Sequence, residues 1–137
     1  MYPPELTAPM RAELIDNGVI DLNTPEAVDT AVAQGGTCLI YVNSVCGCAA
    51  GAARPGLLAA MQHAEKKPDQ ICTVFAGVDA PAVQTARGHF AEYPPSSPSA
   101  ALLKDGEVVW MLHRHQIEGR HGQEIAEAFV NAWNEHC

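Results

Sequence analysis

The fold is decided by the stretch Thr37-Cys38-Leu39-Ile40-Tyr41-Val42, which runs directly into Asn43-Ser44-Val45-Cys46-Gly47-Cys48-Ala49. Residues 37–42 form a continuous apolar, β-rich run, the pattern of a strand that is buried on both faces. From Ala49 to Lys67 the composition favours a helix, and Pro55 inside that helix should kink its axis because proline lacks an N–H donor. Cys46 and Cys48 therefore lie where a buried strand ends and a helix begins.

Helical and β patterns alternate on both sides of this junction. Residues 71–76 predict a second buried strand, and the helix between the two strands predicts that they are parallel with a right-handed crossover. Lys104-Asp105-Gly106 predicts a hairpin turn between two further strands, because Asp-Gly is a strong turn signal. The other predicted elements are helices over residues 10–17, 26–34, 80–93 and 121–133, a short strand at 19–22, and hairpin strands at 100–103 and 107–112.

The predicted architecture is an α/β three-layer sandwich, with a central mixed sheet and helices on both of its faces. With 137 residues, the chain fits a single domain over residues 1–137 that can bury its own core. The hairpin should add an antiparallel edge to the parallel pair of strands.

Charge and composition narrow the possible partners and compartments. Sixteen acidic residues against eight Lys plus Arg give a net charge of −8, and no basic cluster appears, which argues against nucleic-acid binding. No segment reaches the roughly 18 apolar residues of a membrane helix, and the amino terminus does not resemble a secretory signal. We therefore expect a cytoplasmic protein without a membrane partner.

The position of the cysteine pair indicates thiol–disulfide chemistry. Unpaired N–H groups and the helix dipole at a helix start stabilise a thiolate and lower its pKa, which favours Cys46 as the attacking nucleophile and Cys48 as the resolving thiol. A bridge between cysteines two positions apart requires a distorted backbone, which Gly47 permits because it has no Cβ. A strained bridge is oxidising, so a mixed disulfide on Cys46 should persist.

A metal site is the alternative from another class of protein. A Cys-x-Cys pair can supply two ligands to zinc or Cu(I), but the chain has neither a second such pair nor a His-x₃-His spacing. We therefore predict no metal. Cys38 and Cys72 lie inside the two buried strand patterns, where cysteine behaves as a small hydrophobic residue.

Several motifs along the chain point to one family: Val42-Asn43-Ser44-Val45-Cys46-Gly47-Cys48-Ala49-Ala50-Gly51 with Arg54-Pro55, Val74-Phe75-Ala76-Gly77, Pro95-Ser96-Ser97-Pro98-Ser99, Arg114-His115 with Ile117-Glu118-Gly119, and His136-Cys137. This chain resembles the bacilliredoxin family of thioredoxin-like proteins over nearly its whole length. The resemblance implies a thioredoxin fold and removal of the low-molecular-weight thiol bacillithiol from mixed disulfides on client proteins. It implies that Cys46 attacks and accepts bacillithiol, that Cys48 is the second cysteine, and that bacillithiol is a co-substrate, with no bound cofactor.

The resemblance also implies further site residues. Thioredoxin-like folds place a cis-proline opposite the active cysteine, and Pro98, ahead of a predicted strand, fits that position. We expect Pro98, Ser97, Arg54 and Asn43 to contact the bound thiol. Arg54 and Arg114 are both candidates to hold its carboxylates, and His115 is a candidate proton shuttle. Cys137 is a possible third thiol if the last helix returns toward the motif.

Two departures from thioredoxins distinguish this chain. Val45 precedes the motif where thioredoxins have a tryptophan, and Ile40 stands where they have a buried aspartate. The leading hypothesis is therefore a reductase of bacillithiol mixed disulfides. A general disulfide isomerase or weak oxidant, and a metal-binding protein that uses the Cys-Gly-Cys pair, remain as alternatives.

Overall fold

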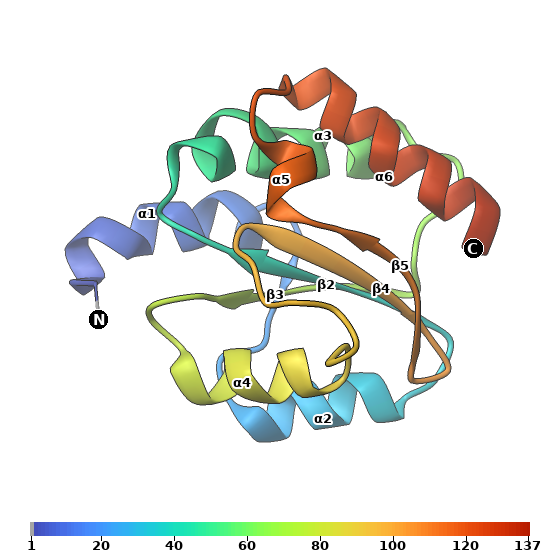
Figure 1. Ribbon diagram of the computed structural model, residues 1–137, viewed down its shortest axis with the longest axis horizontal. Helices are drawn as coiled ribbons and strands as arrows, with labels where there is room; N and C mark the ends of the chain where they lie inside the picture. The colour runs from blue at the N-terminus through green and yellow to red at the C-terminus, as the bar shows by residue number, and fades with distance from the viewer. Residues whose placement is uncertain (1) are drawn as a thin grey trace.

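The computed structural model describes residues 2–137 and contains a five-stranded sheet between two layers of helices (Figure 1). The predicted mixed α/β sandwich is therefore confirmed. In chain order the elements are α1 (Pro4–Ile15), β1 (Ile20–Asp21), α2 (Pro25–Ala33), β2 (Thr37–Asn43), the π-helical turn η1 (Ala49–Ala53), α3 (Arg54–His63), β3 (Gln70–Phe75), α4 (Ala80–Gly88), β4 (Ser99–Lys104), β5 (Glu107–Leu112), α5 (Arg114–Ile117) and α6 (Gly122–His136).

The apolar run of residues 37–42 forms most of β2, the central strand of the sheet. The strand order is β1-β3-β2-β4-β5, and every residue of β2 is buried. β2 pairs with β3 in parallel and with β4 antiparallel, so the predicted parallel pair and antiparallel hairpin are confirmed. Asp105 and Gly106 adopt positive φ angles of 51° and 85°, as a tight hairpin turn with two left-handed residues requires.

Alternating residues of β2 divide the core between the two faces of the sheet. Leu39 and Tyr41 pack into the layer of α1, α3 and α6, whereas Ile40 packs into the layer of α2 and α4 (Figure 1). Cys38 and Cys72 are buried together in this second layer, as their strand positions predict. Because successive side chains of a strand point to opposite faces, a fully apolar strand needs helices on both sides.

A kink at Pro55 was expected in the helix that begins at Ala49. The structure has a π-helical turn before Pro55 instead. Residues 49–53 form a π-helical turn in which the N–H of Arg54 donates to the carbonyl of Ala49, and α3 then begins at Arg54. Pro55 lies in the first turn of α3, where its missing N–H costs little. The proline thus stands next to a widened turn and not inside a bent helix.

Three other helices have ends that sequence patterns did not predict. α1 begins at Pro4 instead of residue 10 and contains Pro9 at an exposed position. α4 ends at Gly88 instead of residue 93, and α6 continues to His136 beyond its buried Trp133. The ends of a helix depend on which of its side chains pack against the rest of the protein, and the local sequence pattern does not contain that information.

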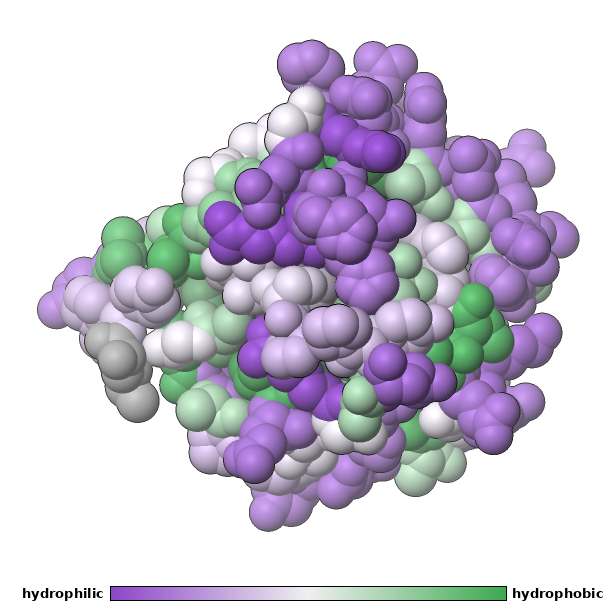
Figure 2. All heavy atoms as spheres, viewed as in Figure 1, coloured by the Kyte–Doolittle hydropathy of each residue, from purple (hydrophilic) through white to green (hydrophobic). Residues whose placement is uncertain are grey.

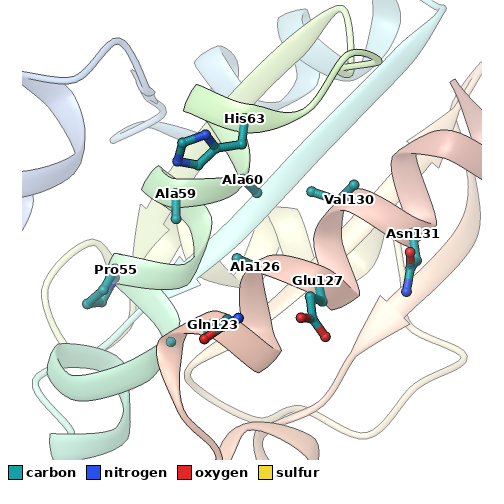
Figure 3. Close-up of a pocket in the computed structure, with 10 residues that line it drawn as sticks. Pro55, Ala59, Ala60, His63, Gln123, Ala126, Glu127, Val130 and Asn131 are labelled. Atoms are coloured by element: carbon teal, nitrogen blue, oxygen red, sulfur yellow. The ribbon is translucent and has the colours of Figure 1, made fainter.

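α3 and α6 pack side by side on one face of the sheet, with a shallow groove along their outer sides (Figure 3). Small residues, among them Ala60 of α3 and Ala126 of α6, line this groove, and neither Cys46 nor Cys48 does. Polar side chains cover most of the face seen in Figure 2, and apolar ones gather toward α1. No helix of residues 2–137 has the length and apolar character that crossing a bilayer needs.

Candidate active site

The two cysteines lie in the short loop between β2 and η1, at the carboxyl end of the central strand. Both side chains are partly exposed, and their sulfur atoms are 2.9 Å apart as free thiols. The N–H of Cys46 donates to the hydroxyl of Ser44 at 3.1 Å, and the carbonyl of Cys46 accepts from the N–H groups of Ala49 and Ala50. The loop therefore turns the chain directly from strand into helix, as the composition predicts.

Four groups act on the sulfur of Cys46 in favour of its thiolate. The main cause of its lowered pKa is the hydrogen bond from the Cys48 thiol, and burial opposes it. The backbone N–H groups of Cys48 and Ala49 and the positive charge of Arg114 lower the pKa further. Hydrogen bonds and a cation that favour a thiolate increase the share of the nucleophilic form of a cysteine.

Cys48 has the opposite electrostatic character. It packs against the apolar core beneath the loop, and this burial is the main cause that raises its pKa to about 11. Its hydrogen bond to Cys46 and the negative charge of that thiolate raise the pKa further. The surroundings of the pair therefore favour the thiolate at Cys46 and the protonated thiol at Cys48.

Arg114 joins the cysteine loop to a second loop that approaches from the other side. Its guanidinium lies 3.1 Å from Cys46 Sγ, donates to the carbonyl of Ser97 at 2.9 Å and pairs with Glu118 at 2.7 Å. Arg114 begins α5, immediately after the hairpin. One partly exposed arginine thus holds the reactive sulfur against the residues before β4, a pairing 68 positions apart that no local motif reveals.

The Ser97–Pro98 peptide bond is cis, as predicted, and Pro98 is buried just ahead of β4. Ser97 is partly exposed, and its carbonyl is the acceptor for Arg114. Because Arg114 also lies against Cys46, this loop borders the reactive sulfur. Ser97 is thus joined to Cys46 through Arg114, whereas Pro98 is buried and its contact with a bound thiol stays a prediction.

Arg54 and Asn43, both expected to contact substrate, lie beneath the loop. Arg54 is 2% exposed and Asn43 is fully buried, so neither offers a surface to a ligand. The guanidinium of Arg54 instead bonds to Glu13, to Asn43 and to the carbonyl of Ser44. The expectation of direct substrate contact is wrong for these two residues, because their polar groups are turned into the protein.

The possible third thiol, Cys137, lies at the other end of the sheet. α6 begins beside Gly56, near the motif, and runs away from it, so that Cys137 ends beside Thr37 at the start of β2. A seven-residue strand separates this point from Cys46, which is a span of roughly 20 Å. The last helix therefore does not return toward the motif, which was the condition for Cys137 to act as a third thiol within one chain (Figure 1).

His115 does not reach the cysteines either. It is exposed and stacks on His113, with ring centroids 5.4 Å apart.

Two residues that sequence reasoning missed lie beneath the loop. Glu13 of α1 pairs with Arg54, and the buried hydroxyl of Tyr41 has no hydrogen-bond partner within residues 2–137. Neither has a sequence signal, because each matters only through residues distant in the chain.

Comparison with known proteins identifies close relatives over the whole chain. A family model described as disulphide isomerase matches residues 2–137. A bacilliredoxin of Cytophaga hutchinsonii is 50% identical over 98% of this chain and 99% of its own length. Bacilliredoxin ABC2045 of Shouchella clausii is 48% identical, over 99% of this chain and 94% of its own.

Solved structures identify the fold. The oxidised thioredoxin of Plasmodium falciparum superposes with a TM-score of 0.58, over 85% of this chain and 98% of its own, at 14% identity. A putative oxidoreductase with a thioredoxin fold superposes with a TM-score of 0.57, over 80% of this chain and 92% of its own, at 16% identity. The chain has a thioredoxin-like fold, with the Cys-Gly-Cys loop at the carboxyl end of its central strand.

Proposed function

Because the chain belongs to the bacilliredoxin family, we propose that it removes bacillithiol from mixed disulfides on client proteins. The family and the fold support a thiol–disulfide redox role. The observation that carries the proposal is the surroundings of Cys46, whose partly exposed sulfur receives a hydrogen bond from Cys48 and another from Arg114. A stabilised and accessible thiolate is what attack on a disulfide requires.

The first step transfers the small thiol to the protein. The Cys46 thiolate attacks the bacillithiol sulfur of the mixed disulfide, a new disulfide forms between them, and the bond to the client breaks. The client leaves as a thiolate and takes a proton from solvent. One disulfide replaces another, so no external oxidant or reductant takes part.

The second step removes bacillithiol from Cys46 by one of two routes, of which only the second leaves the Cys46 thiol reduced. Cys48 can lose its proton and attack Cys46, which releases bacillithiol and leaves a Cys46–Cys48 disulfide. Alternatively, a second bacillithiol attacks the adduct, which yields oxidised bacillithiol and a reduced Cys46. Burial raises the pKa of Cys48, which slows attack by this thiol at neutral pH, and we therefore favour the second route.

The compartment, co-substrate and partners that we propose follow from the same thiol chemistry. We place it in the cytoplasm, where low-molecular-weight thiols keep protein cysteines reduced. Bacillithiol is a co-substrate and no bound cofactor is required. Client proteins that carry bacillithiol are the expected partners.

Mass spectrometry after treatment with oxidised bacillithiol tests the assignment. The unsubstituted protein and Cys48→Ala should each gain one bacillithiol on the peptide that carries Cys46, and Cys137→Ser should behave in the same way. Cys46→Ala should gain none at the motif. An adduct on Cys48 in the Cys46→Ala variant, at the rate of the unsubstituted protein, would sink the assignment.

A general disulfide isomerase or weak oxidant is the second candidate, which the description of the matching family model favours. It would refold a protein with scrambled disulfides, and its action would not depend on bacillithiol. Measured side by side, refolding of a scrambled protein and release of bacillithiol from a client separate the two functions. We expect release to be the faster activity.

A further inference from the structure

Arg54 is a buried cation whose hydrogen bonds converge on the segment that leads to Cys46. Its Nη1 donates to Asn43 Oδ1 at 3.0 Å and to the carbonyl of Ser44 at 2.9 Å. Its Nε donates to Glu13 Oε1 at 3.1 Å, which neutralises the charge. The charged end therefore binds one residue of α1, the last residue of β2 and the first residue of the loop.

The hydrogen bonds continue from Arg54 to the backbone of Cys46. Asn43 Oδ1, which accepts from Arg54, also accepts from the N–H of Ser44 at 2.9 Å. The hydroxyl of Ser44 then accepts from the N–H of Cys46 at 3.1 Å. Both backbone polar groups of Ser44 and the N–H of Cys46 are thus held by one connected set of bonds.

The π-helical turn at residues 49–53 lies between the cysteine loop and Arg54. Arg54 donates its own N–H to Ala49, five residues back, and Pro55 has no N–H with which to close an ordinary α-helical turn. Arg54 is the first residue of α3 after this widened turn, and its guanidinium donates to Asn43 and Ser44. A π turn beside a reactive loop is a recurrent arrangement at functional sites.

We propose that Arg54, with Glu13 as its charge partner, is the positioning residue that holds the 43–46 segment so that Cys46 Sγ meets its stabilising donors. Those donors are the thiol and N–H of Cys48, the N–H of Ala49 and the guanidinium of Arg114. Arg54 acts through the loop and does not touch the reacting sulfur. The inference rests on the proposed role of Cys46 as the attacking thiol.

Stability alone gives little reason to keep a buried ion pair here. Taking a guanidinium and a carboxylate out of water costs free energy that their attraction often only offsets, and apolar residues of similar size frequently stabilise as well. Arg54 nevertheless keeps three directed donors on three different acceptors. A planar group with fixed donors is suited to holding a loop in one shape.

The test is the pH dependence of Cys46 alkylation by iodoacetamide, followed on the Cys46 peptide by mass spectrometry. Arg54→Met should move the midpoint of alkylation to higher pH, and a shift of one unit would slow the reaction at neutral pH by about tenfold. Arg54→Lys keeps the charge but not the fork of donors, so it should show a smaller shift in the same direction. Cys48, Arg114 and Glu118, the other titratable groups at the sulfur, stay unchanged in every variant.

Arg11→Lys is the control for Arg54→Lys, because Arg11 is a partly buried arginine that pairs with two carboxylates, those of Asp21 and Asp79. It should lower the melting temperature and leave the alkylation midpoint in place. If Arg54→Met loses stability but keeps the midpoint of the unsubstituted protein, the proposal is overturned. If Arg54→Met does not fold, the alkylation midpoints of Arg54→Lys and Glu13→Gln are measured in its place. Unchanged midpoints in both variants overturn the proposal.

The two proposals fail separately in these experiments. Iodoacetamide reports the reactivity of Cys46 and is independent of which thiol the protein carries. A shifted midpoint together with no bacillithiol adduct would leave Arg54 as a positioning residue and would reject the substrate. A bacillithiol adduct on Cys46 together with unshifted alkylation midpoints would support the substrate and would reject Arg54 as a positioning residue.

Discussion

Cys46 and Cys48 are the same residue type, two positions apart, and their surroundings push their thiols in opposite directions. The sulfur of Cys46 receives hydrogen bonds and faces the Arg114 cation, which lowers its pKa, whereas burial against the core raises the pKa of Cys48 to about 11. The thiolate is therefore favoured at Cys46 and disfavoured at Cys48. This difference follows from position and not from residue type.

Removing the guanidinium beside the reactive sulfur should weaken the nucleophile. Arg114→Gln removes a positive charge that favours the thiolate, so the pKa of Cys46 should rise and alkylation at neutral pH should slow by roughly three- to tenfold. Arg114→Lys should retain part of the rate. Arg120→Gln, at an exposed position outside these contacts, is the control, and equal pH midpoints for the two Gln variants would contradict the assigned role.

The buried hydroxyl of Tyr41 should contribute nothing to stability. It has no hydrogen-bond partner within residues 2–137, so Tyr41→Phe removes an unsatisfied polar group and should leave the free energy of unfolding unchanged or raise it by about 1 kcal/mol. Thr73→Val is the comparison, because that hydroxyl donates to the Tyr41 carbonyl at 2.9 Å and its loss should destabilise. Urea denaturation measures both, and a larger loss for Tyr41→Phe than for Thr73→Val would show that the phenol has a partner.

At the scale of elements, the close approach of α3 and α6 holds the helix that carries Arg54. Gly56 of α3 faces α6 so closely that a Cβ would lie 2.7 Å from the Cβ of Ile125 and 2.9 Å from the carbonyl of Gly122. Contacts this short, one of them with backbone, cannot be relieved by turning a single side chain. The absence of a side chain at Gly56 therefore sets the distance between the two helices.

Gly56→Ala should consequently separate α3 from α6 and destabilise the protein by about 1–3 kcal/mol, measured by chemical denaturation. Gly88→Ala, at the end of α4 with open space around it, should instead stabilise by about 0.5–1 kcal/mol, because alanine restricts the unfolded chain. Equal stability of the two variants would mean that the helices move apart at no cost.

At the scale of the whole molecule, the two ends of the sheet carry different cysteines. The loop with Cys46 follows the carboxyl end of β2, and Cys137 lies beside Thr37 at its amino end. Cys137→Ser should therefore leave adduct formation and the alkylation midpoint of Cys46 unchanged. Detection of a Cys46–Cys137 disulfide in the monomer by peptide mapping would contradict this placement.

The order of the strands and of the longer helices, the Asp105-Gly106 hairpin turn, the cysteine pair after β2 and the cis Pro98 were predictable from short stretches of sequence, whereas the four-residue helix α5 was not. Each depends on neighbouring residues, or on a motif that the family resemblance supplies. The π turn at residues 49–53 was not predictable, because Pro55 indicated an interruption without specifying its form. The ends of α1, α4 and α6 also depended on surfaces that only the folded chain presents.

The sequence by itself determined the buried strand, the Cys-Gly-Cys loop after it and the thiol chemistry, because backbone propensity and side-chain periodicity act over a few residues. Only the tertiary structure decided which arginine meets the thiolate and which supports the loop. Arg114 reaches Cys46 across 68 positions, and Arg54 reaches Glu13 across 41. Such pairs form when packed helices and strands bring distant side chains together, and no local pattern contains that information.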